Sequence, residues 1–241
     1  MKTPAFVTFA LLASMATGSA LAQSMDIDLT SSDGVTLKGT YTSPGRPGPG
    51  MLLIHQCNMD QSSWDGLTSQ LVGAGIHVLT IDLRGFGDSE GEGMSVGFPN
   101  FLKKSSGDVD LAFEYLAGKD GVDGSRMGVG GASCGAMLTA DLASRQTGVT
   151  TLMLLSGPPS ESAASHIAAT PGLAVFGSAA TEDSILEGVA DAIKGAVDQS
   201  KNPHSMAKLY RGTEHGLPMF EVNSDLEPAL VSWLKNQLLS D

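Results

Sequence analysis

The residues best suited to chemistry lie at 131–135, in the sequence GASCG. Apolar and small residues before this segment indicate a buried strand, and an Ala/Leu/Met run of helical length follows it. The segment is therefore a G-x-S-x-G sequence between a strand and a helix, the context that a nucleophile elbow requires. Glycines two before and two after Ser133 let the flanking backbones approach closely. The serine hydroxyl is then raised clear of the sheet, and the following N–H, at a helix N-terminus, faces any developing oxyanion.

The alternative is a glycine-rich turn without chemistry, because five-residue matches of this kind often arise by chance. The choice depends on the elements that would position Ser133. Continuous apolar runs indicate buried strands, and apolar residues at helical spacing indicate helices with one buried face. We expect strands at 25–30, 35–41, 51–54, 76–82, 150–155, 173–176 and 207–210, with one more leading into the elbow.

Helices are predicted between these strands. We expect them from a cap at Ser62 and Ser63 to a stop at Gly75, at 106–117, after Ser133, at 183–197, and from a capping box at 224–227 to the C-terminus. The Gly/Pro-rich segment 43–50 is predicted to be a loop. Strands that alternate with helices indicate an α/β fold with a doubly wound, mostly parallel sheet and helices on both faces. Ligands bind such sheets at the carboxyl ends of the strands, where Ser133 is expected to lie.

The first 22 residues have the composition of a secretory signal peptide. One lysine precedes an apolar stretch from Ala5 to about Met15, and Ala20-Leu21-Ala22 forms a small-x-small cleavage site. The stretch is too short to span a bilayer; the alternatives are a membrane anchor or a buried helix. We expect cleavage after Ala22, a single domain at 23–241, and a periplasmic or secreted location.

The overall charge restricts the class of partner. The formal net charge is −12, which disfavours nucleic acids and anionic membranes as partners. No spacing typical of metal ligands is visible, so we expect no metal or other cofactor. A small-molecule substrate is the expected partner, and the sequence leaves the oligomeric state open.

Four segments together resemble the α/β-hydrolase superfamily, most closely its dienelactone-hydrolase-like members. They are LLIHQC, DLRGFGDSEG, RMGVGGASCGA and TEHGLPMF, in this order along the chain. The resemblance implies a serine nucleophile, an acid and a histidine, in that chain order. Among the five histidines, only His215 follows the last predicted strand and stands in a His-Gly turn, so we predict His215 as the base.

The acid is harder to assign. Many members of the superfamily place an aspartate about three residues after the glycine that ends the seventh strand, whereas Gly177 is followed by Ser-Ala-Ala. Asp183 and Glu182 are the first acids beyond it and are our candidates, with Glu161 as a further possibility. The alternative is that Thr181 caps a helix and these acids only complement its dipole.

The resemblance also implies an oxyanion hole made from two backbone N–H groups. One belongs to Cys134 and the other to Gln56 or Cys57, in the loop after the third strand. Many members have His-Gly at that strand end, but this chain has His-Gln, which would narrow the site or add a side-chain amide. Since these two loops meet in the implied fold, we predict a Cys57–Cys134 disulfide. Two separate, buried thiols are the alternative.

The leading hypothesis is a serine hydrolase that cleaves a carboxylic ester, lactone or related acyl bond through an acyl-enzyme. Only about seventeen residues separate Leu155 from Leu173, too few for a large cap domain, so a small or medium substrate is expected. Dienelactone hydrolases use a cysteine nucleophile, which makes Cys134 an alternative to Ser133. A motif centred on Cys134 would have alanine at both glycine positions, so steric demands favour the serine. A binding protein that retains the fold with little or no turnover is the other alternative.

Overall fold

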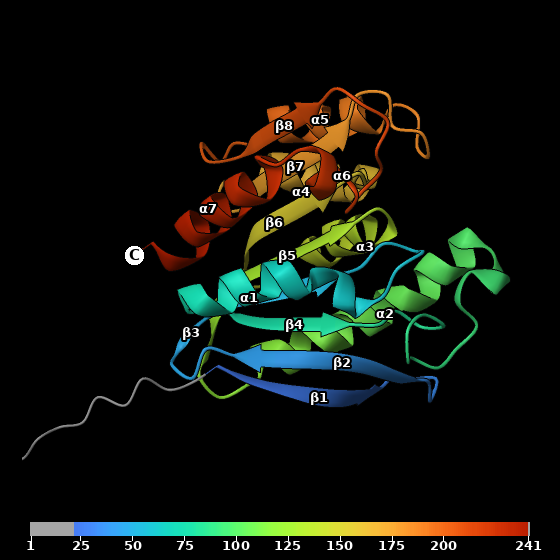
Figure 1. Cartoon of the computed structure of the whole chain (residues 1–241), viewed down its shortest axis with the longest axis vertical. Helices are drawn as coiled ribbons and strands as arrows, with labels where there is room; N and C mark the ends of the chain where they lie inside the picture. Colours follow the sequence, from blue (N-terminus) through green and yellow to red (C-terminus); the bar gives the residue numbers. More distant parts are fainter. Residues whose placement is uncertain (1–21, 241) are drawn as a thin grey trace, which may run out of the picture.

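The computed structural model describes residues 22–240, so residues 1–21 of the predicted signal peptide lie outside the described residues. The described chain contains one eight-stranded sheet, in the order β1-β2-β4-β3-β5-β6-β7-β8 (Figure 1). Strands β3 to β8 are parallel, while β2 is antiparallel to both β1 and β4. The strands are β1 (Gln23–Thr30), β2 (Thr36–Ser43), β3 (Gly48–Ile54), β4 (His77–Ile81), β5 (Val122–Ala132), β6 (Val149–Leu155), β7 (Ala174–Ala180) and β8 (Met206–Tyr210).

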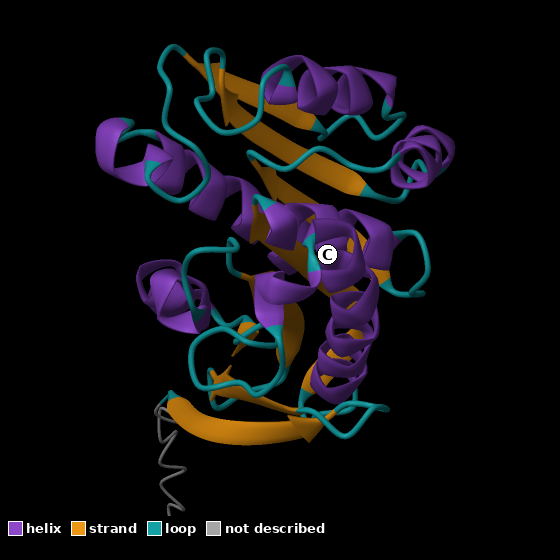
Figure 2. Ribbon diagram, turned by 90° about the vertical axis from the view of Figure 1, so that its right-hand side faces the viewer, coloured by secondary structure: helices purple, strands orange, loops and turns teal. Residues whose placement is uncertain are grey.

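Helices cover both faces of the sheet, which gives the predicted three-layer α/β architecture without a large cap (Figures 1 and 2). One hydrophobic cluster joins α2, α3, α4 and α5 to one face, and a second joins α1, α6 and α7 to the other. The helices are α1 (Asp65–Ala74), α2 (Phe98–Ala117), α3 (Cys134–Ala143), α4 (Glu161–Ala169), α5 (Val189–Gln199), α6 (Met219–Val222) and α7 (Leu226–Leu239). Single 3₁₀ turns, η1 (Gln61–Trp64) and η2 (Gly93–Val96), precede α1 and α2.

The prediction of a loop at 43–50 was wrong at its end, because β3 already begins at Gly48. A Cβ on Gly48 would lie 2.2 Å from the Gly75 carbonyl oxygen, and one on Gly50 would lie 2.8 Å from the Met127 sulfur. Glycine is therefore required at Gly48, where a neighbouring backbone approaches closely, whereas a side chain at Gly50 would need the flexible Met127 side chain to shift. Pro49 is tolerated beside the register shift between Pro49 and Gly50, where the ladder is interrupted.

Several predicted helix starts also differ from the structure. Asp60, rather than Ser62 or Ser63, caps η1, with its side chain accepting from the Ser62 N–H. Helix α2 begins eight residues before the predicted start, because Pro99 is compatible with a first turn and Phe101 extends the buried face. Helix α5 begins at Val189 rather than at 183.

The predicted capping box before α7 does not form, since no side chain caps that helix. Asp225 instead forms an ion pair with Lys208 at 2.8 Å. Glu227 accepts a hydrogen bond from Gln70 of α1 at 2.7 Å. Both acids are therefore engaged by residues far away in sequence, and α7 is held mainly by the apolar residues on its buried face.

Candidate active site

Ser133 stands on a tight turn between β5 and α3, in a backbone conformation that non-glycine residues rarely adopt (φ 52°, ψ −122°). The flanking glycines make the turn possible. A Cβ on Gly131 would lie 2.4 Å from the carbonyl carbon of Gly135, and one on Gly135 would lie 2.3 Å from the carbonyl oxygen of Ile54. The Ser133 N–H donates to the Leu155 carbonyl at 2.7 Å. The strained turn is thus held by its neighbours on both sides.

A chain of hydrogen bonds runs from Ser133 through His215 to Asp183. The Ser133 Oγ lies 2.7 Å from Nε2 of His215, and Nδ1 of His215 lies 2.8 Å from Oδ2 of Asp183. The Asp183 side chain is 1% exposed and the His215 side chain 8%. A carboxylate on Nδ1 keeps the proton on that nitrogen, so that Nε2 is free to accept the serine proton. This is the geometry of an activated hydroxyl nucleophile.

The position of Asp183 follows from the length of β7. The strand continues beyond Gly177 to Ala180, so Asp183 is the third residue after the strand end. The helix that Thr181 would have capped does not form there, and Asp183 Oδ1 instead accepts from the N–H groups of Ile185 and Leu186 at 3.0 and 2.9 Å. These bonds and the His215 bond hold the carboxylate in place.

The other two candidate acids do not reach the histidine in the structure. Glu182 is exposed, and its backbone N–H, not its carboxylate, bonds to the neighbouring loop at Gly212. Glu161 is an exposed residue in the first turn of α4. Of the three predicted acids, the structure therefore brings only Asp183 to His215.

Cys57 and Cys134 form a disulfide that joins the loop after β3 to the N-terminus of α3. Their Cα atoms lie 5.9 Å apart, although 77 positions separate them in sequence. Within the described chain the N–H of Cys134, the first residue of α3, has no protein acceptor, and neither has that of Cys57. Two donors on bonded residues are thus available beside Ser133, as an oxyanion hole requires.

The Gln56 side chain forms hydrogen bonds at the site instead of only narrowing it. Its Oε1 accepts from the Leu217 N–H at 2.9 Å, and its Nε2 donates to Asn58 Oδ1 at 2.7 Å. The amide thus ties the loop after β3 to the loop that carries His215. A Cβ on Gly216 would lie 2.2 Å from Gln56 Oε1, which explains the glycine after the histidine. The sequence indicated an amide at this place but not the segment that it binds.

His55 has a structural role. It is fully buried, and its Nε2 accepts from the Leu83 N–H at 2.9 Å while Nδ1 donates to the Gln56 carbonyl at 2.8 Å. Burial lowers the pKa of His55, so the neutral ring holds the ends of β3 and β4 together beside the site.

A cavity of about 410 Å³ opens above Ser133. Amide, disulfide and apolar side chains line it together with the serine and the histidine: Gln56, Cys57, Asn58, Ser133, Ile185, His215 and Pro218. Ile185 is 72% exposed. Sequence reasoning missed Ile185 and Pro218, because a single apolar residue in a loop carries no pattern. It also missed Gly157, where a Cβ would lie 2.1 Å from the Ser133 carbonyl oxygen.

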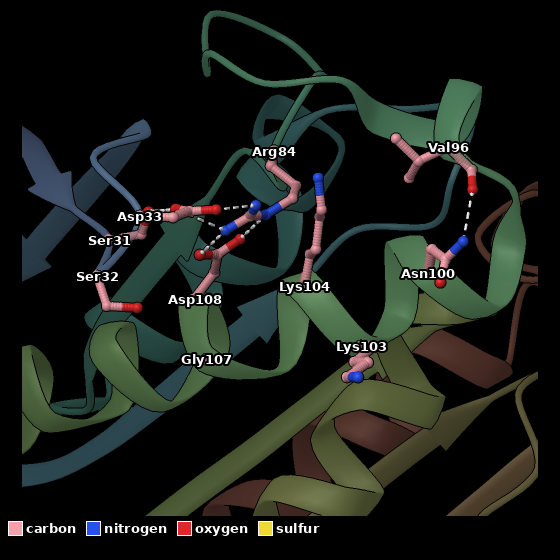
Figure 3. Close-up of a pocket in the computed structure, with 10 residues that line it drawn as sticks. All are labelled: Ser31, Ser32, Asp33, Arg84, Val96, Asn100, Lys103, Lys104, Gly107 and Asp108. Carbon is pink, nitrogen blue, oxygen red and sulfur yellow. Dashed lines mark hydrogen bonds and ion pairs between the residues drawn. The ribbon is translucent and has the colours of Figure 1, made fainter.

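A second cavity, of about 570 Å³, lies between α2 and the turn after β1 (Figure 3). Its charged centre is Arg84, which is paired with Asp108 through Nε at 2.6 Å and with Asp33 through Nη1 at 2.9 Å.

Across residues 22–240 there is no cluster of three or more His, Cys, Asp or Glu side chains suited to a metal ion. In the same range, no helix has the length and apolar character to cross a membrane.

Comparison with known proteins gives matches at the level of family and of fold. A family model described as serine aminopeptidase, S33, matches residues 46–217. Two uncharacterized proteins of Mycobacterium tuberculosis are 32% identical over 127 residues, which is 52% of this chain. The chain spans only 43% of the length of these relatives over that match.

Solved structures share the whole architecture at low sequence identity. An esterase of Pyrococcus furiosus is 16% identical with a TM-score of 0.72, over 89% of this chain and 93% of its own. A dienelactone hydrolase-like promiscuous phosphotriesterase from metagenomic libraries is 14% identical with a TM-score of 0.70, over 90% of this chain and 99% of its own. At these identities the similarity concerns the fold alone.

Proposed function

Because the chain belongs to the serine aminopeptidase S33 family of α/β hydrolases, we propose that it is a serine esterase. Its substrate is a small or medium carboxylic ester, lactone or related acyl compound. The observation that carries the proposal is the hydrogen-bonded series Ser133–His215–Asp183, on a strained turn at the floor of an open cavity. A cavity of about 410 Å³ suits a substrate of that size.

In the proposed reaction, the Ser133 Oγ attacks the carbonyl carbon while Nε2 of His215 takes the hydroxyl proton. The carbonyl electron pair moves to the oxygen, which the N–H of Cys134 and that of Gln56 or Cys57 stabilise. His215 then gives its proton to the leaving oxygen as the C–O bond breaks, which leaves an acyl-serine. Water attacks this ester with His215 again as base. The bond to Ser133 Oγ then breaks as His215 returns the proton to that oxygen, and the acid product departs.

The disulfide bears on the identity of the nucleophile. A cysteine must be a thiolate to attack a carbonyl, and the sulfur of Cys134 is bonded to that of Cys57. Its register in the turn is also the less suitable one, since alanines would occupy both glycine positions. Both observations favour Ser133 over the cysteine mechanism.

A protein that only binds its ligand is the alternative of a different class. That idea drew its support from the absence of an acid soon after Gly177. In the structure, Asp183 Oδ2 lies 2.8 Å from Nδ1 of His215. A missing acid is therefore no longer an argument for a protein without turnover.

We also propose an exported enzyme that acts on a small molecule without a cofactor. The signal-like N-terminus and the disulfide support a periplasmic or secreted location, because such bonds persist in oxidising compartments. The acidic net charge supports a partner other than nucleic acid.

Labelling with a fluorophosphonate, which reacts with activated serines, tests the proposal directly. We expect the purified mature protein to be labelled and to hydrolyse p-nitrophenyl acetate or butyrate. The variant Ser133→Ala should do neither while it keeps its unfolding temperature. Absence of labelling together with no turnover across short-chain esters and lactones would refute an esterase.

A further inference from the structure

The side chains around the proposed catalytic serine suggest which charge its substrates carry. No lysine or arginine lines the 410 Å³ cavity, whose polar side chains besides Ser133 and His215 are the amides Gln56 and Asn58. Ile185 and Pro218 provide its apolar surface. A carboxylate or phosphate group on a substrate would therefore lose water here without gaining a cationic partner, which is costly.

The two loops that contribute Ile185 and His215 to the cavity wall are rich in acidic residues. Besides Asp183, whose buried carboxylate pairs with His215, the loop after β7 carries Glu182 and Glu187, and the loop after β8 carries Glu214. The two loops contain a single lysine or arginine, Arg211. Backbone hydrogen bonds hold the loops side by side, from the N–H groups of 181, 182 and 184 to the carbonyls of 210, 212 and 213. Their charges therefore act together.

The orientation of one acid is also fixed. The Glu214 carboxylate accepts from the Thr213 N–H at 3.1 Å, which keeps it on the His215 loop. Asp60, at the start of η1, adds a further negative charge on the loop after β3. The three loops that contribute residues to the cavity wall thus carry more acids than cations. Such an excess of negative charge lowers the local concentration of an anionic substrate and its rate of capture.

We infer that the Ser133 site is selective for acyl substrates that carry no negative charge. The inference rests on the proposed esterase function and adds the charge of the substrate to it. A neutral ester buries its acyl chain against Ile185 and Pro218. An ester of the same length that ends in a carboxylate must place that group against amides or apolar carbons, close to loops that carry acidic residues. A cationic ester meets no such repulsion.

Two esters matched in chain length test the inference. p-Nitrophenyl butyrate is neutral, and mono-p-nitrophenyl succinate has the same number of acyl carbons but ends in a carboxylate. At low ionic strength we expect kcat/KM for the butyrate to exceed that for the succinate by about tenfold or more. The gap should shrink as salt screens the acidic residues. Equal values, or a preference for the succinate, would overturn the inference and leave the esterase proposal intact.

A variant at the cavity wall makes the test specific. Ile185 is 72% exposed, so Ile185→Arg introduces a cation without disturbing the core. We expect the succinate-to-butyrate ratio of kcat/KM to be severalfold higher in Ile185→Arg than in the control Ile185→Gln, which loses the same apolar contact but adds no charge. An unchanged ratio in Ile185→Arg would count against the charge argument. Failure of the wild type to hydrolyse either ester would instead refute the esterase function and this inference with it.

Discussion

Two cavities at the carboxyl edge of the sheet differ in what their polar groups are doing. The larger one, around Arg84, contains a guanidinium that donates hydrogen bonds to the carboxylates of Asp108 and Asp33 (Figure 3). The hydrogen bonds that Arg84 donates to the Asp108 carboxylate raise the pKa of Arg84, and those that it donates to Asp33 lower the pKa of Asp33. These charges pair with one another through four hydrogen bonds and so hold α2 to the turn after β1.

The smaller cavity, around Ser133, has the opposite character. Its serine is in a strained conformation, and the N–H groups of Cys134 and Cys57 have no acceptor within residues 22–240. Its histidine is oriented by Asp183 with one nitrogen directed at the serine hydroxyl. Cavity size and charge therefore do not identify a reactive site. A reactive site is identified by groups that are held in place and still have hydrogen-bond donors or acceptors directed at the cavity.

Replacement of Asp183 gives the largest expected effect. Asp183→Asn should lower kcat for p-nitrophenyl butyrate by about 10³-fold or more, because an amide no longer fixes the tautomer of His215. The matched control Glu182→Gln should retain nearly all activity, and so should Glu161→Gln. Full activity in Asp183→Asn would show that another acid serves His215.

Loss of an ion pair in the Arg84 cluster should lower the free energy of unfolding and leave kcat unchanged. Asp108→Ala leaves a buried guanidinium without its main partner and should lower the free energy of unfolding by about 3–5 kcal/mol. Asp110→Ala, on the same helix, removes the exposed partner of Arg145 and should cost about 1 kcal/mol or less. Urea denaturation measures both. If Asp108→Ala lowers kcat of the remaining folded enzyme, the two cavities are coupled.

Loss of the disulfide should change both stability and turnover. The variant Cys57→Ser/Cys134→Ser frees a loop of 77 residues, for which chain entropy predicts a loss of about 4 kcal/mol before other effects. We also expect a lower kcat, since two oxyanion donors are no longer tied together. Thiol titration of the unfolded wild type should find none before reduction and two after it. Two free thiols without reductant would contradict the bond.

Replacement of Gln56 is expected to have a smaller effect on kcat. Gln56→Leu removes the bond to the Leu217 N–H but fills the same space, so kcat should fall about tenfold through misplacement of His215. Affinity for a boronic acid, which mimics the tetrahedral intermediate, should fall with kcat, whereas KM should change little. A fall in stability alone, with normal kcat, would make Gln56 purely structural.

The pH dependence of stability gives the smallest effect. Burial lowers the pKa of His55 and of His77 in the folded state. Below about pH 6.5 the unfolded chain binds protons that these buried rings do not. The free energy of unfolding should therefore decrease as pH falls from 7 to 5.5, by at most about 1.4 kcal/mol per pH unit for each ring. Chemical denaturation across this range measures the slope, which His55→Gln should flatten. An increase in stability on acidification would have the wrong sign.

Much of the fold could be predicted from local pattern. The buried strands are continuous apolar runs, and such runs lead to the mostly parallel sheet with helices on both faces that the structure contains. The segment 131–135 indicates a nucleophile turn because its glycines meet a steric requirement that is local to the chain. Boundaries were less predictable. Segment 48–50 is rich in turn-forming residues, and only its pairing with β5 and β4 makes it part of a strand.

The acid and the links between loops depended on residues that are distant in sequence. The sequence pattern predicts that the seventh strand ends near Gly177. In the structure, pairing with β8 extends β7 to Ala180, and this added length places Asp183 beside His215. The Gln56–Leu217 bond joins positions 161 apart. A residue's own chemistry and its near neighbours decide whether it is suited to attack a carbonyl or accept a proton. Which of several such residues meet is decided by how strands pair and loops pack, since one added residue pair in a sheet moves everything that follows.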